Sequence, residues 1–414
     1  MAKTSLSLFA GFGIEIEYMI VSRDSLDVMP IADYILYDEK LGQLNEIEAN
    51  ELCYSNELAS HILELKTNGP ITDLITLPEI FNKHINKINN MLAEKNSYLL
   101  PTAMHPWMNP AEEFKIWPHE YSDIYESYNK IFNCQGHGWS NVQSTHLNLP
   151  FANDEEFAKL HAAIRLVLPL IPIIAASSPI VESGLSGYID TRLFYYNNNQ
   201  KKIPIVAGGI IPDHFVSEYE YKSKLLDQIY QAITPYDKSE ILQEEWLNSR
   251  GAIARFDRNT IEIRLIDTQE SPISDFAIIS LLVSLLQNLV YNNFASHCDQ
   301  TSISTKRLKK TYLDAVRFGS NCLINDREYL QIFGCDFSKC TGLELLAKIF
   351  TNIQKSNYPI ADKFIPILEN ILKNGNLSER ILKRLNGDLS KENIRRTYLE
   401  LRMILNNNDI FLSN

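Results

Sequence analysis

Two acidic pairs near the start of the chain have spacings that could bring carboxylates together around divalent cations. Glu15 and Glu17 alternate with apolar residues, which predicts a strand with both carboxylates on one face. Glu57 and Glu64 are seven residues apart, so they would share a helix face or converge across a turn that leads into a strand. Carboxylate oxygens suit Mg²⁺. Taken singly, each pair is more typical of a solvated strand or helix face.

Two later segments add an imidazole, an amide and two guanidinium groups. His146 and Asn148 share one face of a predicted strand, where the imidazole could bind a metal and the amide a substrate oxygen. Glu262 and Arg264 share a face of another predicted strand, and Arg255 lies on the strand joined to it by a tight turn. A carboxylate beside two arginines suits phosphate binding. The alternatives are a structural histidine and cross-strand ion pairs.

The elements that would position these side chains predict an α+β fold. Strands rich in β-branched and aromatic residues are expected at 13–21, 140–149, 203–206, 252–256 and 260–266. Helical periodicity is found at 77–95, 155–174, 216–233 and 272–291, and then in the tail at 306–317, 341–354, 361–373, 377–385 and 391–405. We expect a catalytic core of residues 1–290 with antiparallel strands, and a helical C-terminal region of residues 291–414 packed on it.

Composition narrows the class of protein. The 414 residues are 45% hydrophobic and carry a net charge of -12, which argues against nucleic-acid binding. Six cysteines without CxxC spacing indicate reduced thiols, and the start of the chain does not resemble a signal peptide. No window approaches 18 uncharged apolar residues, so no segment is expected to cross a membrane and the sequence predicts a soluble cytoplasmic protein. Neither GxxxxGK[ST] nor GxGxxG is present, so any ATP phosphates would be held by metals and arginines.

The order of the motifs resembles that of glutamate–cysteine ligases and the related carboxylate–amine ligases of the glutamine-synthetase-like superfamily. The matching segments, spread over residues 11–280, are GIEIEY from position 13, the acidic pair before TNGP, STHLNLP from 144, AASSP from 175 and IEIRLIDTQESP from 261. The resemblance implies a glutamine-synthetase-like curved antiparallel sheet flanked by helices, which forms a funnel with ATP entering at one end and amino acids at the other.

The resemblance also implies roles for individual residues. The ligands of two or three Mg²⁺ or Mn²⁺ ions would be Glu15, Glu17, Glu57, Glu64, His146 and Glu262. Arg264 and Arg255 would be catalytic residues that contact phosphate, and the substrate-binding residues would be Asn148, Arg192, His105 and Trp107. Structural roles are the alternative for the last three. Where many relatives have His-x-His, this chain has His146 followed by Asn148, and residues 180–250 do not align.

The implied reaction is ATP-dependent amide formation between the γ-carboxylate of glutamate and the amine of cysteine through an acyl phosphate, a step of glutathione biosynthesis. A different carboxylate or amine is one alternative, and a guanidino kinase of the same superfamily is another. A binding protein that kept the scaffold is less consistent with six intact candidate ligands, and an unrelated α+β protein is the remaining alternative. The sequence does not determine the amine substrate, the oligomeric state, feedback inhibition or the role of the C-terminal helices.

Overall fold

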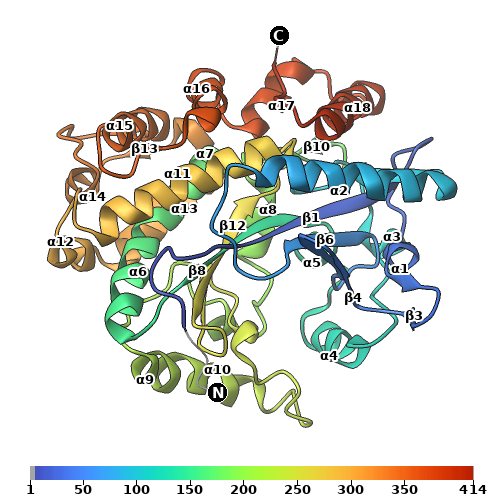
Figure 1. Ribbon diagram of the computed structural model, residues 1–414, viewed down its shortest axis with the longest axis horizontal. Helices are drawn as coiled ribbons and strands as arrows, with labels where there is room; N and C mark the ends of the chain where they lie inside the picture. Colours follow the sequence, from blue (N-terminus) through green and yellow to red (C-terminus); the bar gives the residue numbers. More distant parts are fainter. Residues whose placement is uncertain (1–4, 414) are drawn as a thin grey trace.

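The computed structural model describes residues 5–413, and its centre is an antiparallel sheet of eight strands (Figure 1). The strands are β1 (Gly13–Ser22), β4 (Glu46–Ala49), β5 (Leu52–Asn56), β6 (Ile62–Thr67), β7 (Ser97–Leu100), β8 (Ser144–Pro150), β11 (Ala252–Arg255) and β12 (Thr260–Asp267). Their order is β11-β12-β8-β1-β6-β5-β4, and β7 pairs with the second half of β1, beyond β8. The predicted α+β class with an antiparallel sheet is confirmed.

Alternation along β1 gives the sheet two different faces. Ile14, Ile16 and Tyr18 are fully buried on the face covered by helices, whereas Glu15 and Glu17 point to the other, which we call the acidic face. The covering layer contains α2 (Leu77–Leu92), α6 (Asp154–Val167) and α11 (Pro272–Val290). Helix α11 packs on both of the others, and α2 and α11 lie across the sheet (Figure 1).

The C-terminal helices pack around this covering layer, some of them directly on α11 or α2 (Figure 1). They are α12 (His297–Ser302), α13 (Thr305–Phe318), α14 (Arg327–Ile332), α15 (Gly342–Gln354), α16 (Ile365–Asn374), α17 (Leu377–Leu385) and α18 (Lys391–Asn407). Reciprocal capping boxes, Thr341 with Glu344 and Asn376 with Glu379, begin α15 and α17. The predicted boundary at residue 290 falls on the last residue of α11.

Shorter elements connect the layers. The helices are α1 (Ala32–Ile35), α3 (Pro110–Glu113), α4 (Ser122–Phe132), α5 (His137–Ser140), α7 (Ile171–Ala175), α8 (Thr191–Tyr196), α9 (Glu218–Tyr221) and α10 (Asp227–Ile233). The two-residue strands pair as β2 (Tyr37–Asp38) with β3 (Gly42–Gln43), β9 (Ile180–Val181) with β10 (Gly184–Leu185), and β13 (Leu323–Ile324) with β14 (Cys340–Thr341).

Several local predictions were wrong. Residues 203–206 form no strand: Pro204–Val206 is a single 3-10 turn, since proline fixes φ and has no N–H to give to a sheet. The strand expected from residue 140 begins at 144, because residues 137–140 form α5. Strands β4 to β7 were not predicted, and the β13–β14 hairpin adds a small ladder to the helical tail.

The expectation that no segment is apolar and long enough to cross a membrane was also wrong. Residues Asp154–Ala175 and Pro272–Val290 both meet that criterion. In each, 89% of the most apolar window is buried inside the protein, as expected of helices at the centre of a large core.

Candidate active site

Strand register brings the acidic residues together on one face. Residues directly opposite each other in neighbouring antiparallel strands point to the same side of the sheet. The opposed pairs are Glu15 with His146, Glu17 with Glu64, and Asn148 with Glu262. Glu57 follows β5 in the turn that leads into β6, and Glu64 lies on β6. The two residues therefore converge across a turn, which was the second of the two expected arrangements, and do not share a helix face.

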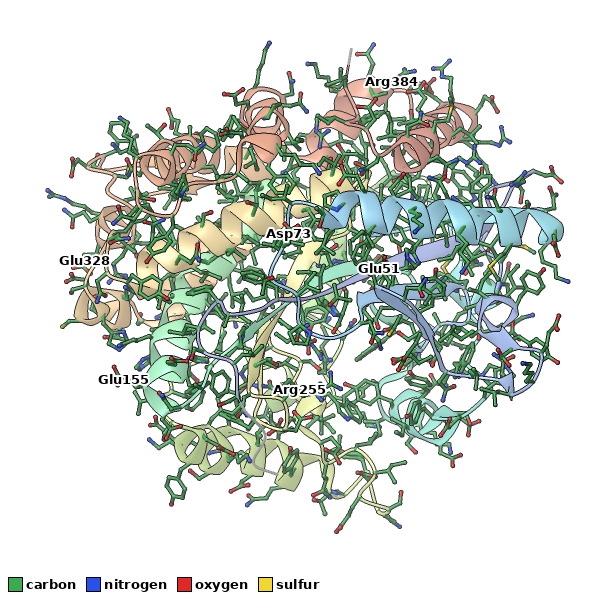
Figure 2. The ribbon with its side chains drawn as sticks, viewed as in Figure 1. Glu51, Asp73, Glu155, Arg255, Glu328 and Arg384 are labelled. Atoms are coloured by element: carbon green, nitrogen blue, oxygen red, sulfur yellow. The ribbon has the colours of Figure 1, made fainter. Side chains whose placement is uncertain are left out.

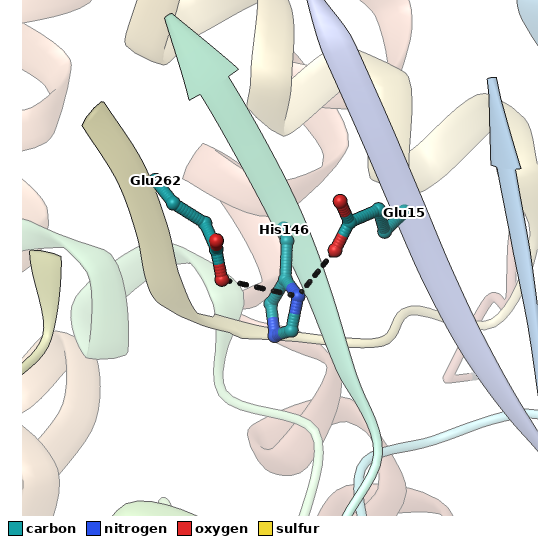
Figure 3. Close-up of side chains that lie close together, drawn as sticks. All are labelled: Glu15, His146 and Glu262. Atoms are coloured by element: carbon teal, nitrogen blue, oxygen red, sulfur yellow. Dashed lines mark hydrogen bonds and ion pairs between the residues drawn. The ribbon is translucent and has the colours of Figure 1, made fainter. Parts of the chain in front are cut away.

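His146 lies at the centre of the acidic face, between two carboxylates from the neighbouring strands (Figure 3). Its Nδ1 atom is 2.9 Å from Glu15 Oε2 and 3.8 Å from Glu262 Oε1. Asn148 donates from Nδ2 to the other oxygen of Glu15 at 3.1 Å. Since the potential ligand atoms of Glu15, His146 and Glu262 all lie within 4.8 Å of one another, a single ion could contact all three.

A second group shares the imidazole and extends toward β6. Potential ligand atoms of Glu17, Glu64 and His146 also lie within 4.8 Å of one another. Hydrogen bonds orient both carboxylates: the Ser144 backbone N–H donates to Glu17 Oε2 at 2.7 Å, and the Ser55 hydroxyl donates to Glu64 Oε1 at 2.6 Å. The donor set is mainly hard oxygen, which fits Mg²⁺, and the imidazole also fits Mn²⁺.

Burial and neighbouring charges shift the pKa values of the carboxylates in this cluster in different directions. Burial raises the pKa of Glu64 to about 7, and burial together with the charge of Glu17 raises that of Glu57 well above its usual range. Burial acts to raise the pKa of Glu15 as well, but the hydrogen bond and charge of His146 outweigh it and lower the value to about 2. His146 is affected in the opposite sense: burial acts to lower its pKa, and its contacts with Glu15 and Glu17 raise it to about 9. Buried carboxylates that compete for one imidazolium are the environment that divalent cations neutralise.

Two arginines border this cluster on the β11–β12 side. The Nε atom of Arg264 is 2.5 Å from Glu262 Oε1, and one terminal nitrogen of Arg255 is 3.9 Å from Glu262 Oε2. Arg255 also pairs with Asp257 in the turn between the strands. In Figure 2, Arg255 lies toward the side of the molecule opposite the C-terminal helices, which the label of Arg384 marks. Both predicted phosphate contacts therefore lie beside predicted metal ligands.

Two cavities adjoin the acidic face. The first, the aromatic cavity, has a volume of about 390 Å³ and is lined by all six predicted metal ligands. Five aromatic side chains also line it: Tyr125, Tyr128, Trp139, Tyr196 and Trp246. The second, the loop cavity, has a volume of about 520 Å³ and is lined largely by turns, including residues 11–14, 67–70 and 258–260. Glu15, Lys66 and Arg258 line both cavities, so the two meet beside the metal cluster.

Arg192 lies in the wall of the aromatic cavity but is tied to the protein. Its side chain is 2% exposed, and its Nε atom is 2.5 Å from Asp267 Oδ1. Asp267 also accepts hydrogen bonds from the backbone N–H of Ser177 and the hydroxyl of Ser178. The charge of Arg192 is thus neutralised internally, and its role in binding a substrate carboxylate stays a prediction.

His105 and Trp107 lie outside both cavities. His105 is fully buried, with Nε2 2.7 Å from the Leu26 carbonyl oxygen. The Trp107 indole N–H donates to Asp27 at 2.9 Å, and the ammonium of Lys391 from α18 lies 5.2 Å from the ring centre. The structure does not bring either residue to the metal cluster, and their assignment to substrate binding stays a prediction.

Sequence reasoning missed Lys66 and the aromatic wall. Lys66 follows Glu64 by two residues, so recognising β6 as a strand would have placed it on the acidic face. The rings come from α4, α5, the end of α8 and the turn at residue 246, so no local periodicity connects them.

Comparison with known proteins gives consistent matches. The family model described as glutamate–cysteine ligase family 2 matches residues 11–400, including most of the helical tail, in which no motif had been recognised. An uncharacterised protein from Archaeoglobus fulgidus is 31% identical over 403 residues, which cover 97% of this chain and all of the relative.

Solved structures give matches at lower sequence identity. The glutamate–cysteine ligase of Francisella tularensis in complex with AMP is similar with a TM-score of 0.59 and 12% identity, over 94% of this chain and 88% of the other. The complex of Pup with its ligase PafA matches with a TM-score of 0.48 and 12% identity, over 98% and 77%. The first of these supports the fold, and the extent of the family match shows that this chain belongs to glutamate–cysteine ligase family 2.

Proposed function

We propose that the protein joins the γ-carboxylate of glutamate to the amine of cysteine, with ATP converted to ADP and phosphate. Membership of the family makes the chain an ATP-dependent carboxylate–amine ligase, and the choice of glutamate and cysteine is the proposed part. The observation that carries the proposal is the convergence of six metal-capable side chains and Arg264 on one cavity, although Glu15 and Arg264 are 249 residues apart in the sequence.

The residues fit divalent cations. Glu15, His146 and Glu262 would hold one ion, and Glu17 and Glu64, with the shared imidazole, another. Glu57 lines the same cavity and would be a further ligand, and burial raises the pKa values of Glu57 and Glu64, which a bound cation would lower. Bound Mg²⁺ would supply positive charge for the polyphosphate and for the phosphoryl group in transfer.

The side chains around the cluster would then activate a poor electrophile. A carboxylate resists attack by an amine, so the γ-phosphoryl group of ATP first passes to a carboxylate oxygen of glutamate, giving an acyl phosphate and ADP. Arg264 and Arg255 would contact phosphate oxygens, where negative charge develops. The amine then attacks the carbonyl carbon, phosphate leaves, and the amine proton passes to a nearby carboxylate or to solvent.

The two cavities suit different substrates. The loop cavity is lined by turns with exposed backbone, and Gly69 adopts a φ of +86° in the turn after β6. We assign it to the nucleotide, because its phosphates would reach the cluster beside Glu15. The aromatic cavity, which holds the carboxylates and the rings, is assigned to the amino acids, and sulfur contacts with aromatic rings would favour the cysteine side chain.

The test follows products and not only ATP consumption. Purified protein with ATP, Mg²⁺ and glutamate is incubated with each amino acid in turn, and ADP, phosphate and product mass are measured. The expected result is ADP and phosphate in equal amounts, with a product of the combined mass of glutamate and cysteine less one water. ATP-dependent product with another amine would correct the substrate and keep the reaction.

A kinase reaction is the second candidate, since the same metal and arginine cluster suits phosphoryl transfer. It would give ADP and a phosphorylated substrate without free phosphate, so the phosphate measurement separates the two. The proposed partners are small-molecule substrates, without nucleic acid or membrane. A cytoplasmic location and a place in glutathione biosynthesis belong to the same proposal.

A further inference from the structure

Lys66 occupies the point where the two cavities meet. It lies on β6 directly opposite Glu15 of β1, so its side chain shares the acidic face with the metal cluster. Of the residues lining the cavities, it is one of three that line both, and it is the only lysine among them. Lys66 therefore places a positive charge between the proposed nucleotide site and the proposed amino-acid site, where Arg258 is the other cationic residue that lines both cavities.

The present partners of Lys66 are two carboxylates of different character. Its Nζ atom is 2.5 Å from Glu46 Oε2 and 3.4 Å from Glu64 Oε1. Glu46 lies on the edge strand β4, and its side chain is 47% exposed, whereas that of Glu64 is 8% exposed. An ion pair with an exposed carboxylate contributes little stability, so a stronger anion can displace Glu46 at small cost.

We propose that Lys66 is a phosphate-binding residue that exchanges Glu46 for an oxygen of the terminal phosphates of ATP. The inference rests on the proposed function, because it needs ATP in the loop cavity with its phosphates at the cluster. Once cations neutralise Glu64, the attraction that this carboxylate exerts on Lys66 is reduced. A lysine ammonium on a flexible stem is suited to follow a phosphate that moves from nucleotide to substrate, since it binds as a point charge without fixed geometry.

A purely structural role is the competing explanation. Lys66 could serve only as counter-ion for Glu46 and Glu64, holding β4 and β6 together. In that case its removal would lower the melting temperature and leave nucleotide affinity unchanged. Affinity for ATP compared with AMP separates the two roles, because AMP lacks the β- and γ-phosphates.

The experiment is calorimetric titration of ATP and of AMP, each with Mg²⁺, into wild type, Lys66→Met, Glu46→Gln and the exposed control Lys83→Met. We expect Lys66→Met to weaken ATP binding at least about tenfold, the loss of one charge-assisted hydrogen bond, and to change AMP binding less than about twofold. Glu46→Gln removes the competing carboxylate and should tighten ATP binding by about twofold or more. The control should match wild type.

Several outcomes would overturn the inference. An unchanged affinity of Lys66→Met for ATP would do so, as would equal losses for ATP and AMP. If Lys66→Met does not fold, the Glu46→Gln variant decides. Weaker ATP binding by folded Glu46→Gln would overturn the inference, because Glu46 would then favour ATP binding and not compete with it. If wild-type protein binds ATP but forms no amide, the proposed substrates are wrong and Lys66 can still be a phosphate contact. If wild-type protein does not bind ATP, both the proposed function and the role of Lys66 are overturned.

Discussion

Metal affinity should fall steeply as the solution is acidified through neutrality. Burial raises the pKa of Glu64 to about 7, and a divalent cation binds the carboxylate and not the protonated acid. With that pKa, about 90% of Glu64 is ionised at pH 8 and about 10% at pH 6, so the apparent dissociation constant should rise about tenfold between these values. This tenfold rise in the dissociation constant is a minimum, because the ion must also displace protons from Glu57 and His146. Burial raises the pKa of Glu57 well above its usual range, and the pKa of His146 is about 9.

The assay is titration of Mn²⁺ into nucleotide-free protein, with free ion measured by electron paramagnetic resonance at pH 6, 7 and 8 and constant ionic strength. Glu64→Gln should bind Mn²⁺ more weakly than wild type at pH 8. Its dissociation constant should also change about tenfold less between pH 6 and pH 8, since the amide does not titrate in this range. Glu94→Gln, which alters an exposed carboxylate, should behave as wild type. A wild-type dissociation constant that changes less than about twofold from pH 6 to pH 8 would refute these carboxylates as ligands.

Three further predictions concern activity and stability. Glu262→Ala should reduce turnover at least about 100-fold, measured by ADP release at saturating substrates, because a metal ligand and the partner of Arg264 are both lost; near-normal turnover would remove Glu262 from the site. Burial raises the pKa of Asp275 to about 8, whereas an aspartate in the unfolded chain ionises at about pH 4. Between these two pH values the folded state holds a proton that the unfolded chain has lost. The free energy of unfolding should therefore carry a contribution that falls from pH 5 to pH 8 and is absent in Asp275→Asn, as urea unfolding would measure; parallel profiles for the two proteins would contradict it. Arg380→Met would leave the fully buried Glu270 without its partner at 2.6 Å and should cost about 3–5 kcal/mol, seen as a lower melting temperature that substituting Glu270 as well partly restores.

Local patterns in the sequence carried much of the site. The alternation of residues 14–18 correctly predicted which side chains of β1 face the core and which face the cluster. The same alternation placed Glu262 beside Arg264, and the structure joins them at 2.5 Å. These predictions succeeded because the side-chain direction in a strand depends on position alone.

Other residues could be placed only by the folded chain. Arg192 was expected to reach a substrate carboxylate, yet its nearest carboxylate is Asp267, 75 residues away and fully buried. His105 and Trp107 have the residue types of a binding site, but the packing of their loop directs them away from the cluster. Nothing in the residues near these positions specifies which distant group each will meet.

The sequence by itself determined the acidic face and the types of ligand on it, because strand periodicity and carboxylate chemistry are local properties. Tertiary structure alone decided that β12 lies beside β8 and that β1 lies between β8 and β6. It also decided that Lys66 stands where two cavities meet. Those arrangements follow from how the helices and the sheet bury their apolar surfaces against one another, a long-range requirement that no single segment encodes.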